Sequence, residues 1–268
     1  MKLGFIGGGN MAAALIGGLR RRANKGEEII VVERDGSRRS LLERDFGVGT
    51  RATIDAGLEE SAIVVLAVKP ADVQQVCESL RAVPGQRLVL SIAAGIPSAA
   101  IARWSGTDAV VRAMPNTPAL IGQGITGLFA RSGVSSEQRA AATRTLRVIG
   151  EAVWFGDEAM LDAVTAISGS GPAYVFYFIE ALQEAARQMG MGTDQARHFA
   201  VQTFVGAAQL AAQSTEDLSL LRERVTSKGG TTAAALERLR ESNVGPAITA
   251  AAFAALERSR EMARTLGS

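Results

Sequence analysis

The sequence predicts a two-domain protein of the α/β class, with a doubly wound, mostly parallel sheet followed by an all-helical domain. Up to about residue 157, short apolar runs alternate with helical patterns, as they do in βαβ units. A glycine-rich turn joins the first apolar run to the first helical pattern. From about residue 158 onward, helical periodicity continues to the end. The 268 residues are enough for two domains, which we predict at 1–157 and 158–268.

Seven apolar runs in the first domain are predicted as strands. Ile63–Val68 is continuous and rich in β-branched residues, which is typical of a strand covered on both faces. The other runs are Lys2–Ile6, Ile29–Glu33, Leu88–Ile92, Val110–Arg112 and the weaker Thr126–Ala130 and Ala152–Phe155. Helices are expected near Met11–Arg22, Arg38–Asp45, Ala71–Leu80, Ala99–Trp104 and Ser136–Ile149, the last capped by Ser135 or Ser136.

The second domain is predicted to be entirely helical. Its helical patterns are Met160–Ile167, Ala173–Met189, Asp194–Gln213, Leu218–Val225, Thr231–Glu241 and Gly245–Thr265. Small residues such as the run Ala250–Ala252 allow helices to approach closely, within one chain or between two. Because aromatic residues to fill a core are few, we expect this domain to gain its core by dimerising.

Composition excludes several classes of protein. A net charge of +2 is too small to indicate a nucleic-acid partner. Glu180 and Glu184 interrupt the most apolar stretch, so no membrane span is expected. Cys77 is the only cysteine and His198 the only histidine, which argues against a metal site. The lone cysteine also fits a reducing compartment, and we expect a cytoplasmic protein.

The first turn of the chain has the pattern of a dinucleotide-binding Rossmann domain. An apolar strand precedes Gly-x-Gly-x-x-Ala, and a helical pattern follows it. Gly7 permits the tight turn, Gly9 lets the backbone approach a diphosphate, and Ala12 allows close packing of strand and helix. The diphosphate would lie at the helix N-terminus, where free N–H groups meet negative charge. The predicted contacts are Gly7, Gly8, Gly9, Asn10, Met11 and Ala12.

The end of the second strand selects between the two nicotinamide cofactors. An acidic residue there binds the adenosine ribose, whereas a basic residue accepts a 2′-phosphate. This chain carries both, because Glu33 favours NADH and Arg34 favours NADPH. We predict NADPH, with NADH as the alternative, because one guanidinium can stack on adenine and bind phosphate. Arg38 and Arg39 follow as further basic residues, with a solvated helix start as the structural alternative for them.

Other predicted cofactor contacts lie where strands end, because those ends face the ligand crevice of an open α/β sheet. Small residues and prolines there could line a flat nicotinamide without clashes. The predicted contacts are Ala67, Val68, Lys69, Pro70, Ala93, Gly95, Met114 and Asn116. Lys69 is expected to contact the cofactor through its backbone or at a ribose rather than to act as a general acid. Asn116 either orients the nicotinamide amide or forms a turn between two prolines.

Five further segments carry a recognisable pattern: Ala67–Pro70, Ser91–Gly95, Arg112–Ala119, Ser168–Tyr174 and Val225–Thr232. Particularly specific are Met114-Pro115-Asn116-Thr117-Pro118 and Gly229-Gly230-Thr231-Thr232. In this order and spacing the segments resemble the pyrroline-5-carboxylate reductase family over almost the whole chain, from Gly4 to about Met262. The resemblance implies a homodimer with interlocked helical domains, often within a larger ring, and an active site at the dimer junction.

The resemblance also implies the reaction, in which hydride from NAD(P)H reduces 1-pyrroline-5-carboxylate to L-proline, the last step of proline biosynthesis. The family's substrate loop would hold the imine carboxylate through Ser227, Gly230, Thr231 and Thr232. The Thr232 hydroxyl would reach the ring nitrogen as the catalytic group. Lys228 departs from the proline that many members carry, which bears on the rigidity of the loop. A plain helix cap is the structural alternative for these Ser and Thr residues.

Two other functions remain open. A β-hydroxyacid or phosphogluconate-type dehydrogenase shares the plan of the fold but needs a Lys-x-x-x-Asn motif. The helix after Ser168 carries no lysine, which argues against that reaction. A cofactor-binding regulator without turnover is the non-enzymatic alternative, since fold alone does not prove activity. The preferred cofactor, the assembly size beyond a dimer and the acceptance of six-membered imines are not predicted by the sequence.

Overall fold

The structure is a computed structural model that describes residues 1–21 and 27–267. The chain forms two compact units, Met1–Ser170 with Ala255–Ser268, and Gly171–Ala254. Arg22, with which the first helix is predicted to end, lies outside the described residues. The predicted functional boundary after residue 157 stays a prediction.

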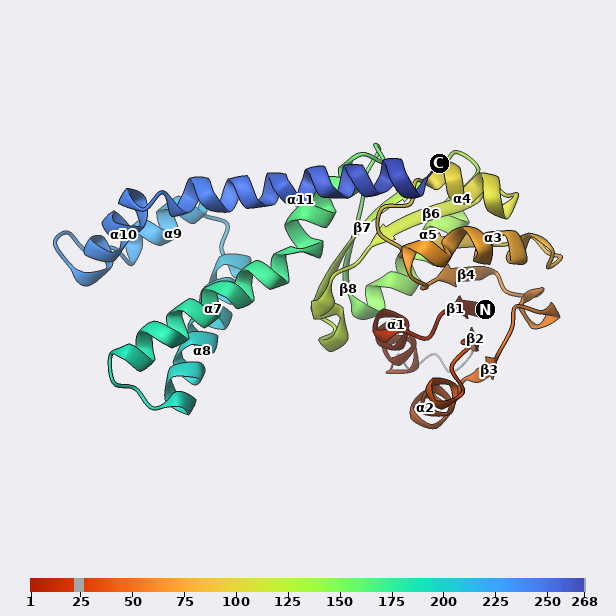
Figure 1. The fold of residues 1–268 in the computed structure, drawn as a ribbon, viewed down its shortest axis with the longest axis horizontal. Coiled ribbons are helices and arrows are strands. Elements are labelled where there is room, and N and C mark those ends of the chain that lie inside the picture. Colours follow the sequence, from red (N-terminus) through yellow and green to blue (C-terminus); the bar gives the residue numbers. More distant parts are fainter. Residues whose placement is uncertain (22–26, 268) are drawn as a thin grey trace. The chain divides into compact units, whose positions relative to one another are not determined.

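The first unit is built on one sheet of eight strands in the order β3-β2-β1-β4-β5-β6-β7-β8 (Figure 1). The first six in that order run parallel, β7 is antiparallel to β6, and β8 is parallel to β7. The order reverses between β1 and β4, so the crevice between their carboxyl ends is where such sheets bind ligands. The strands are β1 (Lys2–Ile6), β2 (Glu28–Val32), β3 (Gly49–Arg51), β4 (Ile63–Leu66), β5 (Leu88–Ser91), β6 (Val110–Met114), β7 (Gly124–Ala130) and β8 (Gly150–Trp154).

Helices cover both faces of this sheet. Leu3 and Phe5 of β1 face one core with Leu15 and Ile16 of α1, whereas Ile6 belongs to the opposite core. Full burial of each large apolar side chain contributes about 1.5–3 kcal/mol. The α-helices are α1 (Asn10–Arg21), α2 (Gly36–Phe46), α3 (Val73–Arg81), α4 (Ser98–Ser105), α5 (Ser136–Leu146) and α6 (Met160–Val164). Short turns of other helix types are η1 (Ala56–Leu58), η2 (Pro70–Asp72), η3 (Thr117–Ile121), η4 (Arg147–Ile149) and the π-helical η5 (Thr165–Gly169).

The predicted elements are present, with ends shifted by up to three residues. β3 was not expected, because Gly49-Thr50-Arg51 has no apolar run. It exists because β2 offers an open edge, on which Ile30 pairs with Gly49 and Val32 with Arg51. Of the two predicted caps of α5, Ser135 is the one used, in a capping box with Gln138.

The second unit consists of helices only, as predicted. It contains α7 (Gly171–Gln188), α8 (Thr193–Gln213), α9 (Leu218–Arg224), α10 (Thr231–Glu241) and the first part of α11 (Val244–Leu266). Helices α7 and α8 pack side by side (Figure 1). Aromatic side chains such as Phe176, Tyr177 and Phe199 are more than half exposed in the single chain. His198, in α8, is exposed. In the described part of the chain, no helix is both long and apolar enough to span a membrane.

Gly150→Ala is expected to destabilise the first unit severely. Gly150 has φ +139°, and a Cβ there would lie 1.8 Å from the Gly124 carbonyl oxygen of the paired strand β7. Backbone strain and overpacking together predict a loss of about 3 kcal/mol or more in the free energy of unfolding. Denaturant unfolding measures it. The matched control is Gly47→Ala, which has φ +60° but open space around a Cβ and should cost about 1–2 kcal/mol. Equal losses in the two variants would contradict the role assigned to the close approach.

Candidate cofactor and substrate sites

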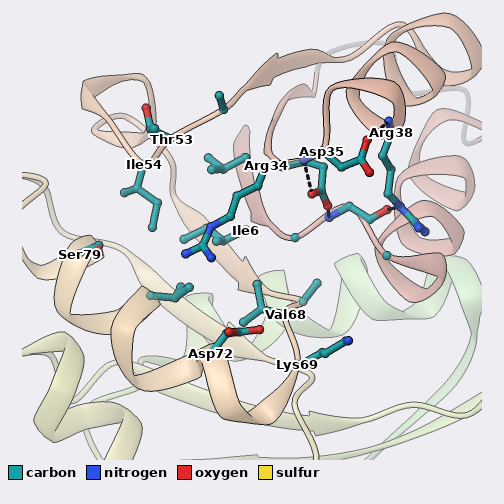
Figure 2. Close-up of a pocket in the computed structure, with 18 residues that line it drawn as sticks. Ile6, Arg34, Asp35, Arg38, Thr53, Ile54, Val68, Lys69, Asp72 and Ser79 are labelled. Carbon is teal, nitrogen blue, oxygen red and sulfur yellow. Dashed lines mark hydrogen bonds between the residues drawn. The ribbon is translucent and has the colours of Figure 1, made fainter.

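A cavity of about 610 Å³ opens at the carboxyl ends of β1, β2 and β4, at the point where the strand order reverses (Figure 2). Eight predicted cofactor residues line it, namely Gly7, Gly8, Gly9, Glu33, Arg34, Ala67, Val68 and Lys69. The position, the glycine turn and the following helix α1 make it a dinucleotide site of the expected type. Its lining also includes Asp35, Arg38, Thr53, Ile54, Asp72 and Ser79, which are not among the predicted contacts.

The three glycines of the turn are required for different reasons. Gly7 has φ +96°, and a Cβ would lie 2.5 Å from the Ala67 carbonyl oxygen. At Gly8 a Cβ would lie 2.6 Å from Leu42 Cδ1. At Gly9 a Cβ would meet no protein atom within 4 Å. The packing of the protein therefore explains Gly7 and Gly8, whereas the absence of a side chain at Gly9 keeps the space over the α1 N-terminus open for a diphosphate.

Glu33 is held against the glycine turn by its carboxylate. Gly8 N donates to Glu33 Oε2 at 2.8 Å, and Asp35 N donates to Glu33 Oε1 at 3.0 Å. Hydrogen bonds from the Ser37 hydroxyl and from Arg38 N lower the pKa of Asp35, which caps α2. Two carboxylates therefore line the part of the cavity next to β2.

Arg38 and Arg39 are not a solvated helix start, and that interpretation is wrong. Arg38 Nε donates to the Gly8 carbonyl at 2.6 Å, and its Nη2 donates to Asn10 Oδ1 at 2.9 Å. Arg39 Nη1 donates to the backbone carbonyls of Glu33 and Arg34. Both side chains thus brace the glycine turn and the end of β2. No local pattern reveals this, because the partners of Arg38 are about 30 residues away in the chain.

Arg34 differs from these arginines because its guanidinium has no hydrogen bond or ion pair within the described ranges 1–21 and 27–267. Figure 2 shows it reaching from the end of β2 into the middle of the cavity. It is a cation available to a ligand, while Arg38 and Arg39 are occupied by the protein itself.

The remaining predicted cofactor residues lie outside the lining of this cavity, at the same edge of the sheet or at the start of α1. They are Asn10, Met11, Ala12, Pro70, Ala93, Gly95, Met114 and Asn116. Ala93 and Gly95 lie in the turn after β5, and Met114 ends β6. Asn116 is buried, and its Oδ1 accepts a hydrogen bond from Ile125 N at 3.0 Å, so this side chain organises the turn into β7. Lys69 is exposed and precedes η2.

The predicted substrate loop lies in the second unit and opens helix α10. Gly230 N donates to the Ser227 carbonyl at 3.0 Å, which closes a tight turn before Thr231. The N-cap of α10 is Gly230, and no side chain caps it. Within the described residues 1–21 and 27–267, no capping hydrogen bond from the hydroxyls of Ser227, Thr231 or Thr232 is found, and their assignment to a substrate carboxylate stays a prediction. The N-terminus of an 11-residue helix with uncommitted hydroxyls suits a carboxylate. Lys228 is exposed.

Comparisons with known proteins agree with this architecture. Residues 158–262 match the family model described as pyrroline-5-carboxylate reductase dimerisation. Residues 2–95 match the model described as NADP oxidoreductase coenzyme F420-dependent. The pyrroline-5-carboxylate reductase of Pseudomonas aeruginosa is 41% identical over 268 residues, covering 99% of this chain and 98% of that protein. The chain belongs to the pyrroline-5-carboxylate reductase family.

Solved structures of the family superimpose on the chain over nearly its whole length. The reductase of Coxiella burnetii is 38% identical, with a TM-score of 0.91 and 97% of each chain covered. That of Plasmodium falciparum, solved with NADP bound, is 27% identical, with a TM-score of 0.86 and 98% of each chain covered. These matches support the predicted fold and NAD(P)H as the cofactor, and the dimerisation family supports a homodimer or homo-oligomer.

Gly9→Ala is expected to weaken cofactor binding without changing stability. Its Cβ would fill the space above the α1 N-terminus but would touch no protein atom. We expect the Kd for NADPH to rise roughly tenfold or more, about 1.4 kcal/mol, as measured by titration calorimetry. Gly156→Ala, also with open space, is the matched control and should bind normally. A Gly9→Ala protein with unchanged Kd would refute the ligand-based explanation for this glycine.

Proposed function

We propose that the protein reduces 1-pyrroline-5-carboxylate to L-proline with NAD(P)H, the final step of proline biosynthesis. The observation that carries this proposal is the dinucleotide cavity at the switch point of a chain that aligns end to end with reductases of that name. In chemical terms, hydride adds to C5 of the cyclic imine and the ring nitrogen retains a proton, so that a C=N bond becomes C–N.

The two predicted domains are proposed to bind different reactants. Residues 1–157 bind the cofactor, which supplies the hydride when bound, and residues 158–268 bind the substrate and dimerise. Ser227, Gly230 and Thr231 hold the substrate carboxylate, and Thr232 donates to or accepts from the ring nitrogen through its hydroxyl. Orientation of two bound reactants is itself worth several kcal/mol in the barrier.

No strong acid or base is needed for this reaction, because a protonated imine is already electrophilic. Cys77 is fully buried, and burial raises its pKa to about 12, so it does not provide a thiolate at neutral pH. Hydroxyacid oxidation, by contrast, requires a positioned base. Helix α7, GPAYVFYFIEALQEAARQ, contains no lysine, which disfavours the β-hydroxyacid dehydrogenase alternative.

The exposed aromatic side chains of the helical unit support an assembly in which a second copy covers them. We propose a homodimer that associates further into a larger homo-oligomer in the cytoplasm.

The decisive assay follows oxidation of NADPH and of NADH, in parallel, with 1-pyrroline-5-carboxylate. We expect consumption of cofactor and formation of proline. Binding of cofactor without consumption by either would instead favour the non-catalytic regulator.

Thr232→Ala is expected to lower kcat roughly tenfold to a hundredfold, since removing one hydroxyl contact to the reacting atoms costs about 1–3 kcal/mol. The Kd for NADPH should change little, because the cofactor is bound by the other unit. Thr232→Ser keeps the hydroxyl and should retain most activity. Wild-type turnover in the alanine variant would remove Thr232 from its proposed role.

Glu33 and Arg34 are proposed to contact the same adenosine ribose but to favour different cofactors: Glu33 favours NADH and Arg34 favours NADPH. Arg34 is the uncommitted arginine at the end of β2 and should attract a 2′-phosphate, while the Glu33 carboxylate should accept from a 2′-hydroxyl and repel the phosphate. We expect Arg34→Ala to weaken NADPH roughly tenfold and NADH much less, since an Arg–phosphate contact is worth about 1.5–3 kcal/mol. Glu33→Gln should shift the ratio of Kd values toward NADPH. Parallel losses for both cofactors in both variants would contradict this division.

A further inference from the structure

A second group of polar side chains lies at the carboxyl edge of the sheet, in the first unit and outside the lining of the cofactor cavity. Glu158, which precedes α6, is its centre. Arg112 Nη1 of β6 donates to Glu158 Oε1 at 2.6 Å. Ser98 N donates to Oε1 at 2.6 Å, and Ser98 Oγ donates to Oε2 at 2.5 Å. Ser98 is the first residue of α4, so Glu158 supplies the N-terminal cap that Pro97 does not.

The burial of this group makes it a fixed arrangement rather than a surface ion pair. The Arg112 and Glu158 side chains are 10% and 25% exposed, and Ser98 is fully buried. Burial alone would raise the pKa of Glu158, but the hydrogen bonds from Ser98 and Arg112 outweigh it and lower the pKa. Removing one partner of such a pair leaves an unpaired buried charge, which is far less favourable than the pair.

The group fixes one particular turn. Residues 92–97 form the turn that connects β5 to α4. Ser98 follows this turn directly, and its hydrogen bonds to Glu158 fix the end of the turn. On its other side, Gly95 packs against Met262 of α11, with φ +73° and only 3.0 Å available between a Cβ and Met262 Cβ. The ends of β5 and β6 are neighbours, since Ser91 pairs with Arg112. Two contacts from distant parts of the chain therefore hold a turn at the ligand edge of the sheet.

The position of this turn gives the group a function. A dinucleotide lies across the carboxyl edge on both sides of the switch point. The cavity beside β1, β2 and β4 would hold the diphosphate and adenosine, and the nicotinamide would then extend toward β5 and β6. We propose that Glu158 is a positioning residue for hydride transfer: through Ser98 it fixes the turn 92–97 against which the nicotinamide lies. This inference rests on the proposed function.

The chain offers a matched control for this role. Asp108 makes the same three kinds of contact, accepting from Arg131 Nε at 2.5 Å, Gly133 N at 2.9 Å and Ser132 Oγ at 3.3 Å. It precedes β6 and so lies at the opposite, amino end of the strand from the cofactor edge. Asp108→Asn should therefore affect stability without affecting the cofactor.

The experiment compares Glu158→Gln with Asp108→Asn. For Glu158→Gln we expect kcat to fall about tenfold to a hundredfold, as misplacement by about 1 Å does. The deuterium isotope effect from 4-deuterated NADPH should rise, and the Kd for NADPH should change less than about threefold, because the diphosphate contacts are intact. The fluorescence of the bound reduced nicotinamide should move toward that of free NADPH. Asp108→Asn should match the wild type in all four measurements.

The outcomes separate the two proposals. Wild-type kcat and nicotinamide fluorescence in folded Glu158→Gln would overturn the positioning role, as would equal losses in Asp108→Asn. If Glu158→Gln does not fold, Ser98→Ala replaces it, since it removes one of the three donors; wild-type fluorescence and kcat there would overturn the role. A wild-type protein that fails to reduce the imine would refute the proposed function alone, because the fluorescence comparison does not require turnover.

Discussion

The close approach of Gly7 to the Ala67 carbonyl is the constraint on which the cofactor site depends. Gly7 has φ +96°, and a Cβ there would collide with the Ala67 carbonyl oxygen, so only glycine lets the chain turn this close to the end of β4. That turn aims α1 so that its N-terminus faces the crevice where the strand order reverses. The same strands bury Leu3 and Phe5 in one core and Ile6 in the other. Strand β1 therefore contributes to both cores of the sheet and, at its end, to the geometry of the diphosphate site.

Charge around the glycine turn is organised by the same arrangement. The Gly8 amide donates to Glu33 and the Gly8 carbonyl accepts from Arg38, so the turn is fixed by a carboxylate and a guanidinium at once. Once these groups are committed, Arg34 is the arginine of the cavity wall that stays available to a ligand (Figure 2). A charged side chain also holds the backbone near β5 and β6, where the Glu158 carboxylate accepts hydrogen bonds from both Ser98 and Arg112. In both places backbone geometry at the ligand edge is maintained by charged side chains from distant segments.

Much of the fold was predictable, because its signals are local. The continuous run Ile63–Leu66 and the alternation of strands with helices indicate a parallel sheet from hydrophobic pattern alone. β3 was missed because Gly49-Thr50-Arg51 carries no such pattern and pairs only because β2 has an open edge. The bracing role of Arg38 was missed for a related reason: its partners, the Gly8 carbonyl and Asn10 Oδ1, lie about 30 residues away and become neighbours only after folding. Asn116 was assigned two alternatives; its bond to Ile125 N shows that the side chain organises the loop before β7, while contact with the nicotinamide stays a prediction.

Local patterns in the sequence specify the two-part organisation, the dinucleotide turn and the family, because glycine spacing, strand periodicity and short motifs are properties of neighbouring residues. The folded structure is needed to see which arginine of the cavity is available to a ligand and that Glu158 binds Ser98, 60 residues away. Those facts depend on hydrogen-bond partners that are distant in the chain. No local pattern encodes them, since a buried polar group takes whichever partner the packed fold brings within reach.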